Sequence, residues 1–263
     1  MPGDGAVVAI SSAVAYGNVG LRATVAGLQA SGQRAIELPT VVLSNHPGLG
    51  RPAGVRLAAA ELGAMMDALE QLGQLDRAGA VMTGYFASAE QVEAMADRLA
   101  RLKARHDGLI ILVDPVIGDE ESGLYVEQPV AAAIRDRLVP LASIVTPNRF
   151  ELGWLASCTI ASEHEATTAA RALNIPETVA TSVAAAESEI VTLAITRETV
   201  ARSASPWHAA VPHGAGDLLA GLYLGRRLAG ADAGGSLAGA MRLLQPVIER
   251  SAGREVLDLE IPC

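Results

Sequence analysis

Two glycines and an aspartate stand together at the start of an apolar segment late in the chain. Gly214, Ala215, Gly216 and Asp217 precede the run Leu-Leu-Ala at 218–220, which predicts a helix beginning at the glycines. Glycines there let backbone N–H groups converge on an anion, and the helix dipole adds to the attraction. A carboxylate beside a bound phosphate favours a catalytic base. The alternative is an ordinary glycine-rich helix start in which Asp217 only complements the dipole.

Polar residues also follow five of the predicted strands. The segments are 11–12, 44–46, 83–85, 114–119 and 146–151. Strand and helix patterns alternate along the chain, which predicts a mostly parallel sheet whose ligands bind at the carboxyl ends of the strands. We therefore expect Asp114, Asp119 and Glu151 to share a cleft with Asp217. A divalent cation would bridge such carboxylates and a phosphate.

Each of these residues has a structural alternative. Asp114 and Asp119 could be turn aspartates. Asn148 could cap a helix with Glu151 as its N3 partner. Two further alternatives are a solvated loop residue for His46 and a core residue for Tyr85.

Composition limits the class of protein. The net charge is −9 and Lys103 is the only lysine, so we expect no nucleic-acid partner. No apolar run reaches the roughly 18 residues of a membrane span, and no secretory signal pattern is present, so we expect no membrane association. Cys158 and Cys263 form no CxxC or Cys/His cluster, which favours a reducing, cytoplasmic location without structural zinc.

The element pattern predicts one α/β domain over residues 1–263, without linker or repeat. The first strands are expected at 6–11, 34–43, 79–83, 109–113 and 142–146. Helices are expected at 20–30, 57–72, 88–104, 130–138, 150–156, 162–173, 215–228 and 235–249. Four successive strands at 178–182, 189–195, 199–203 and 208–211 have no helix between the last three, which predicts an antiparallel extension at one sheet edge.

Together these motifs resemble those of the ribokinase-like superfamily and, within it, the pyridoxal kinases. The superfamily resemblance rests on residues 214–217 and on Asn148-x-x-Glu151. The narrower one rests on segments 9–17, 43–46, 82–85, 114–119, 123–126 and 146–152. The resemblance covers about residues 6 to 249. It implies a three-layer αβα sandwich and ATP-dependent phosphorylation of the 5′-hydroxymethyl group of pyridoxal, with pyridoxine and pyridoxamine as further substrates.

The resemblance also implies roles for individual residues. Asp217 would be the base, with backbone N–H groups of Gly214, Ala215 and Gly216 facing the transferring phosphoryl group. The substrate pocket would contain Ser12, Asn45, His46, Pro47 and Tyr85. The nucleotide site would contain Asp114, Tyr125, Thr146, Glu151, Thr181 and Ser182. Asp114, Asp119 and Glu151 would hold Mg²⁺, directly or through water. A monovalent cation such as K⁺ and a homodimer are further implications.

Three positions depart from the family pattern. Ala215 stands where Thr or Val is usual, which leaves the backbone donors unchanged. Pro47 replaces a common Thr, and Ala13 stands where His is frequent. The last two concern the substrate pocket, so a hydroxymethylpyrimidine kinase or another small-molecule kinase of this fold is an alternative. A non-catalytic vitamin-binding or regulatory protein is a second alternative.

Overall fold

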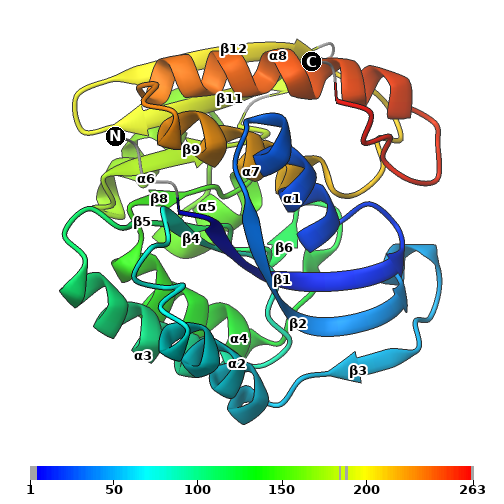
Figure 1. Ribbon diagram of the computed structural model, residues 1–263. Coiled ribbons are helices and arrows are strands. Elements are labelled where there is room, and N and C mark those ends of the chain that lie inside the picture. The colour runs from blue at the N-terminus through cyan, green and yellow to red at the C-terminus, as the bar shows by residue number, and fades with distance from the viewer. Residues whose placement is uncertain (1–4, 184, 187–188, 262–263) are drawn as a thin grey trace.

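A single ten-stranded sheet runs through the computed structural model (Figure 1), which describes residues 5–183, 185–186 and 189–261. Its strand order is β10-β11-β9-β8-β5-β4-β1-β2-β3, and β12 pairs with β11. The strands of this sheet are β1 (Val7–Tyr16), β2 (Ala35–Asn45), β3 (Gly54–Arg56), β4 (Ala80–Thr83), β5 (Ile110–Val113), β8 (Ile144–Val145), β9 (Glu177–Ala180), β10 (Ala185–Ala186), β11 (Glu189–Thr196) and β12 (Val200–Pro206). A separate small hairpin joins β6 (Gly118–Asp119) to β7 (Gly123–Leu124).

The central strands are parallel, as expected from the alternating pattern. Neighbouring strands from β2 through β1, β4, β5 and β8 to β9 all pair in parallel. Strands β4 and β8 are short apolar runs that are buried along their length, since helices cover both faces of the sheet.

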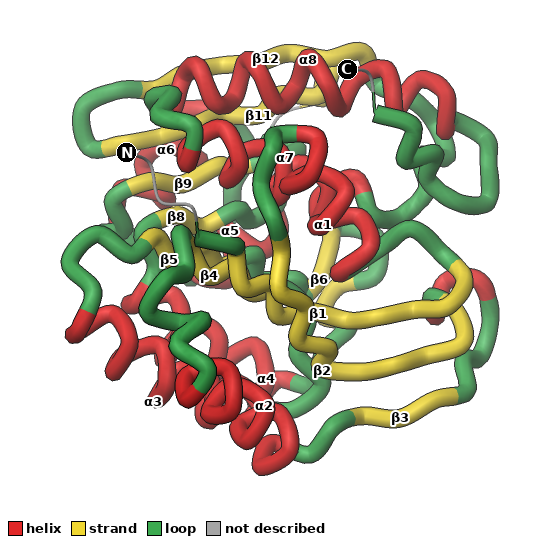
Figure 2. Tube along the Cα trace, viewed as in Figure 1, coloured by secondary structure: helices red, strands yellow, loops and turns green. Residues whose placement is uncertain are grey.

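Helices form a layer on each side of the sheet (Figures 1 and 2). They are α1 (Leu21–Ala30), α2 (Ala59–Gln71), α3 (Ala89–Arg105), α4 (Gln128–Ala133), α5 (Arg149–Ala156), α6 (Glu163–Ala172), α7 (Ala215–Leu228) and α8 (Ala233–Ser251), with short turns η1 (Pro47–Leu49), η2 (Ile134–Leu138) and η3 (Val139–Leu141). One core lies between the sheet and α2, α3 and α4, and another between the sheet and α1, α7 and α8. This confirms the three-layer αβα architecture.

The first strand is longer than predicted. Strand β1 pairs with β4 only from Val7 to Ile10, and then continues beside β2 to Tyr16. The register shifts between Ser11 and Ala13, so Ser12 lies at a β-bulge. A bulge interrupts the alternation of side chains, which is why the pattern predicted a strand ending at residue 11.

The antiparallel edge extension is confirmed, since β11 pairs antiparallel with both β9 and β12. The β11–β12 turn is closed by the Thr196 hydroxyl, which accepts N–H groups of Glu198 and Thr199. The prediction of a strand at 208–211 is wrong, because those residues form a turn and loop. Ala210 has a left-handed φ of 53°, and its carbonyl accepts the N–H of Gly253. The segment at 208–211 is therefore bonded to the chain after α8 and does not pair with a strand.

Two observations concern the surroundings of the chain. Within the described residues, no helix is long and apolar enough to cross a membrane. Cys158 is exposed and unpaired, while Cys263 lies outside the described residues.

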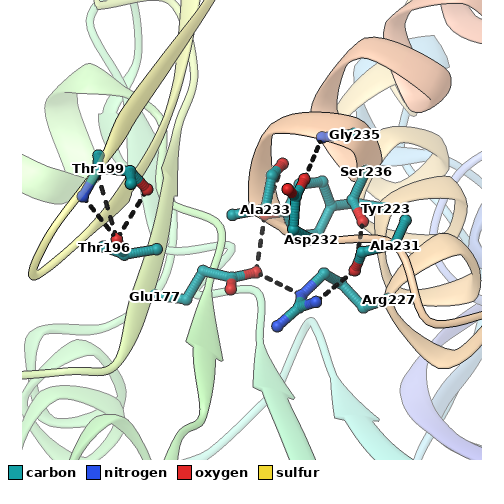
Figure 3. Close-up of polar contacts among 10 residues, drawn as sticks. All are labelled: Glu177, Thr196, Thr199, Tyr223, Arg227, Ala231, Asp232, Ala233, Gly235 and Ser236. Atoms are coloured by element: carbon teal, nitrogen blue, oxygen red, sulfur yellow. Dashed lines mark hydrogen bonds and ion pairs between the residues drawn. The ribbon is translucent and has the colours of Figure 1, made fainter.

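A buried carboxylate joins the sheet to two helices. Glu177, at the start of β9, accepts a hydrogen bond from the Tyr223 hydroxyl at 2.7 Å and one from Arg227 Nε at 3.0 Å (Figure 3). Arg227 also donates to the carbonyl of Ala231, just before α8. The side chain of Glu177 is 6% exposed, so its charge depends on these two partners.

Replacing Arg227 with Met should lower the free energy of unfolding by about 2–4 kcal/mol, because it leaves a buried carboxylate without its cation. The matched control is Arg105→Met, which removes an exposed ion pair to Glu70 and should cost about 0–1 kcal/mol. Urea unfolding of both variants measures the difference. Equal losses would show that burial of Glu177 does not decide the energy of this pair.

Candidate active site

The start of α7 presents unpaired backbone N–H groups. Gly214 is the N-cap residue, and the first helical hydrogen bond runs from Leu218 N–H to Gly214 C=O at 3.0 Å. The N–H groups of Gly214, Ala215, Gly216 and Asp217 therefore lie ahead of the helical hydrogen bonds and are available to an anion. Gly214 has φ 108°, and a Cβ there would lie 2.0 Å from the Asn18 carbonyl oxygen. Only glycine fits this position.

Asp217 lies one turn into α7 and is held from the opposite side. Its Oδ2 accepts the N–H of Gly20 at 2.9 Å, across 197 residues of sequence. Burial raises the pKa of Asp217 to about 6, while the Gly20 hydrogen bond and the nearby His213 partly oppose the shift. The carboxylate is thus fixed in position and ionised at neutral pH, as a general base requires.

Two more carboxylates are buried beside Asp217. Asp114 directly follows β5 and is 7% exposed, and Glu151 on α5 is 3% exposed. Burial, then the charges of Glu151 and Asp217, raise the pKa of Asp114 well above its usual value. Burial raises the pKa of Glu151 to about 7, although three backbone N–H groups oppose the shift. Burial is the largest cause of both shifts, because it disfavours the charged form of a carboxyl group.

Glu151 also forms the predicted capping box. The Asn148 side chain accepts Glu151 N–H at 2.9 Å, and Glu151 Oε2 accepts Asn148 N–H at 3.0 Å. Its Oε1 accepts the N–H of Ile117 at 2.8 Å, directly before the β6–β7 hairpin. The capping alternative is therefore realised, and the same carboxylate also ties the hairpin to α5. Oε1 also accepts the N–H of Gly118 at 3.4 Å, whereas Oε2 keeps a second acceptor site.

The β6–β7 hairpin carries Asp119, the remaining expected carboxylate, and leads directly to the nucleotide-site candidate Tyr125. Asp119 Oδ1 accepts the N–H groups of Glu121 and Ser122 at 3.1 and 2.6 Å, so Asp119 does shape a turn. Tyr125 follows the hairpin and is 48% exposed. Packing around its hydroxyl, followed by the charges of Glu151 and Asp114, raises its pKa. Tyr125 therefore lies close to the acidic cluster.

The donor set suits a hydrated Mg²⁺. Among the described residues, no group of three His, Cys, Asp or Glu side chains is arranged to hold a metal ion unaided. Mg²⁺ usually keeps several waters and binds one or two carboxylates together with substrate phosphates. Asp114 and Glu151 provide two buried carboxylates that a cation would relieve of repulsion. One oxygen of Asp119 is already used by its turn.

Other nucleotide-site candidates lie at the ends of β8 and β9. The Thr146 hydroxyl is buried and has no hydrogen bond of standard geometry, although it is close enough to Asp114 to oppose the rise in its pKa. Thr181 donates its N–H to Pro147 C=O at 2.9 Å. Ser182 is exposed with φ 54°. Because parallel strands end at one edge, these residues lie on the side of the acidic cleft.

The expected substrate pocket begins at the β1 bulge. A Cβ on Gly20 would lie 2.3 Å from Ser12 Oγ, so Ser12 packs against the residue that donates to Asp217. Tyr85 is held at the end of β4 by two backbone contacts: its N–H donates to Ser11 Oγ at 3.1 Å, and its carbonyl accepts from Thr40 at 2.8 Å. Its side chain is half-buried, so it is not a core residue.

The loop after β2 contacts the residue that precedes α7. The ring of His46 lies 4.6 Å from that of His213, and burial and His213 lower its pKa. Asn45 Nδ2 bonds the carbonyls of His46 and Gly50, so its amide supports the loop. Pro47 is the exposed first residue of η1, where a missing N–H is tolerated.

Three residues around this site were not among the predicted site residues: Asn18, Gly20 and His213. Gly17 and Gly20 both have positive φ, 117° and 57°. The sequence signal was the pair of glycines directly after a strand, which is too common to indicate a site. The contact of Gly20 with Asp217 depends on the tertiary fold.

Comparisons with known proteins agree with this architecture. A family model described as phosphomethylpyrimidine kinase matches residues 25–256. The pyridoxal kinase PdxY of Corynebacterium diphtheriae is 31% identical, over 97% of this chain and 93% of that protein. The crystal structure of pyridoxal kinase from Entamoeba histolytica superposes with a TM-score of 0.90 at 26% identity, covering 97% and 92% of the two chains. The pyridoxal kinase of Leishmania donovani, in complex with ADP and pyridoxamine, gives a TM-score of 0.88 at 27% identity, covering 97% and 93%.

These relatives share the ribokinase-like sandwich and extend over nearly the whole chain. The matched segment includes the carboxylates at residues 114, 151 and 217 and the start of α7. The chain belongs to the phosphomethylpyrimidine kinase family, whose members similar to it include pyridoxal kinases.

Proposed function

We propose that this chain transfers the γ-phosphoryl group of ATP to the 5′-hydroxymethyl group of pyridoxal, giving pyridoxal 5′-phosphate in vitamin B6 salvage. One observation supports the proposal most directly: a buried carboxylate, Asp217, which accepts the N–H of Gly20, lies at the same helix start as the free N–H groups of residues 214–217. A base and an anion site in contact are what an alcohol kinase needs. Relatives that cover nearly the whole chain include pyridoxal kinases.

Asp217 would accept the hydroxyl proton as the 5′-oxygen attacks the γ-phosphorus. The N–H groups of residues 214–217 would donate to the phosphoryl oxygens, where negative charge is greatest in the transition state. Gly20 holds the carboxylate during the transfer. Positioning supplies most of the acceleration, because the reaction needs little covalent help from the protein.

Asp114 and Glu151 would bind Mg²⁺ through water together with the triphosphate, and Asp119 would support the hairpin above them. When bound, Mg²⁺ supplies positive charge to the phosphate oxygens. Thr146, Tyr125, Thr181 and Ser182 would line the phosphate side. Ser12, Asn45, His46, Pro47 and Tyr85 would form the pyridoxal side. Homodimeric assembly, a cytoplasmic location and K⁺ dependence are further parts of the proposal and rest on family resemblance.

A substrate panel tests the proposed activity. With Mg²⁺ and ATP, the purified chain should form ADP in the presence of pyridoxal, with a kcat/KM at least about tenfold above that for hydroxymethylpyrimidine, since a pocket that pairs substrate polar groups rejects analogues lacking them. Pyridoxine and pyridoxamine complete the panel. A preference for hydroxymethylpyrimidine would assign the chain to the alternative kinase, and no substrate-dependent ADP would favour a binding protein.

Replacing Asp217 with Asn should lower kcat about 10³-fold, because it removes the base, while the KM values change little. In the wild type, kcat/KM should rise as pH increases through about 6, since the raised pKa of Asp217 keeps it protonated and inactive below that value. The variant should lose this limb in a steady-state pH profile. Turnover close to wild type would eliminate Asp217 as the base.

Replacing Glu151 with Gln should raise the Mg²⁺ concentration needed for half-maximal activity about tenfold, because one of the two carboxylates proposed to bind Mg²⁺ can no longer carry a charge. The matched control is Glu165→Gln, which alters a similar capping arrangement with Ser162 and Ala161 on α6 and should leave the titration unchanged. If both variants titrate like the wild type, Glu151 acts only as a helix cap.

A further inference from the structure

The segment that follows α8, residues 252–261, is fastened to the end of β1. Asn18 Nδ2 donates to the carbonyl oxygen of Leu257 at 2.6 Å. The Leu257 side chain is fully buried in the core that contains α7. The N–H of Gly253 donates to the carbonyl of Ala210, four residues before Gly214. The segment, red in Figure 1, therefore contacts both chain segments that lead into the active site.

The position of the Leu257 carbonyl is itself well defined. Ser251, at the end of α8, is fully buried and accepts the N–H of Asp258 at 2.8 Å. Arg250 and Arg254 both pair with Asp258. Leu257 is thus held between a buried side chain of its own and a residue anchored to α8. The hydrogen bond from Asn18 ends on a rigid acceptor.

Asn18 belongs to the turn at residues 17–20, which follows β1. This turn also contacts Gly214 and Asp217 at the start of α7. The Asn18 carbonyl packs on Gly214, where even a methyl group would approach it to 2.0 Å. Gly20, two residues later, donates its N–H to Asp217. A displacement of Asn18 would therefore shift both the helix start and the donor that orients the base.

We propose that Asn18 is a positioning residue for phosphoryl transfer and that residues 252–261 form part of the active-site frame. This inference rests on the proposed kinase function. The hydrogen bond between Asn18 and Leu257 fixes the turn at 17–20. This turn contacts Gly214 and donates to Asp217, so it fixes the positions of both residues. A group that acts only through position changes turnover more than substrate affinity, because small misplacement of reacting groups is costly in the transition state.

The test compares variants that differ in a single donor. Asn18→Asp has nearly the same shape but cannot donate from Nδ2, and Asn18→Ala removes the group. Both should lower kcat at least about tenfold with KM for pyridoxal and ATP within about twofold of wild type. Asn18→Gln keeps the amide and should recover part of the turnover. The control is Tyr16→Phe, which removes only the exposed bond to Glu255 and should match the wild type.

Rates are expressed per folded protein, measured by circular dichroism. A wild type that forms no pyridoxal-dependent ADP overturns the proposed function. An active wild type whose Asp and Ala variants keep their kcat overturns the positioning role, as does a rise in KM alone. If Asn18→Asp does not fold, the Ala and Gln variants decide by the same criteria.

Discussion

The structure depends on burying three carboxylates together at the carboxyl edge of a parallel sheet. Burial, followed by the charges of Glu151 and Asp217, raises the pKa of Asp114 well above its usual value. Within the described residues, none of the three forms an ion pair with lysine or arginine. Such an arrangement costs folding free energy. Binding of a cation together with a polyphosphate in the proposed reaction would offset this cost, because the cation neutralises the carboxylates.

In the proposed reaction, positive potential for the phosphates would come mainly from the backbone. Lys103 is the only lysine in the chain, and the start of α7 would take the role that basic side chains play elsewhere. Gly214 is restricted to glycine by the nearby Asn18 carbonyl. Ala215 can stand where Thr or Val is usual in the family, because only its amide would face the anion.

Much of this site could be predicted from the sequence because a parallel sheet brings the residues that follow its strands to one edge. Short apolar strands ending in Asp114, Thr146 and the segment 83–85 predict residues at one edge, and α7 begins and ends where its pattern indicates. Contacts between distant turns could not be predicted. The bond from Gly20 to Asp217 spans 197 residues, and nothing local in the glycine pair reveals it.

Local sequence patterns did not predict the structure of short segments whose conformation depends on tertiary contacts. Ser12 lies at a bulge that breaks alternation, so β1 was predicted five residues too short at its end. The β6–β7 hairpin has two residues per strand, too few for any periodicity. Its placement follows from Glu151, whose Oε1 accepts the N–H groups of Ile117 and Gly118. The sequence offered two alternatives for Glu151, a helix cap or a buried carboxylate near Asp217. In the structure Glu151 is both.

In the proposed reaction, the start of α7 and Asp217 act together on an alcohol oxygen. The most direct measurement follows the γ-phosphoryl group itself, using γ-labelled ATP with pyridoxal and separating the products. We expect label in pyridoxal 5′-phosphate in an amount equal to the ADP formed. Label found only as inorganic phosphate, or no label released while pyridoxal binds, would contradict this joint action.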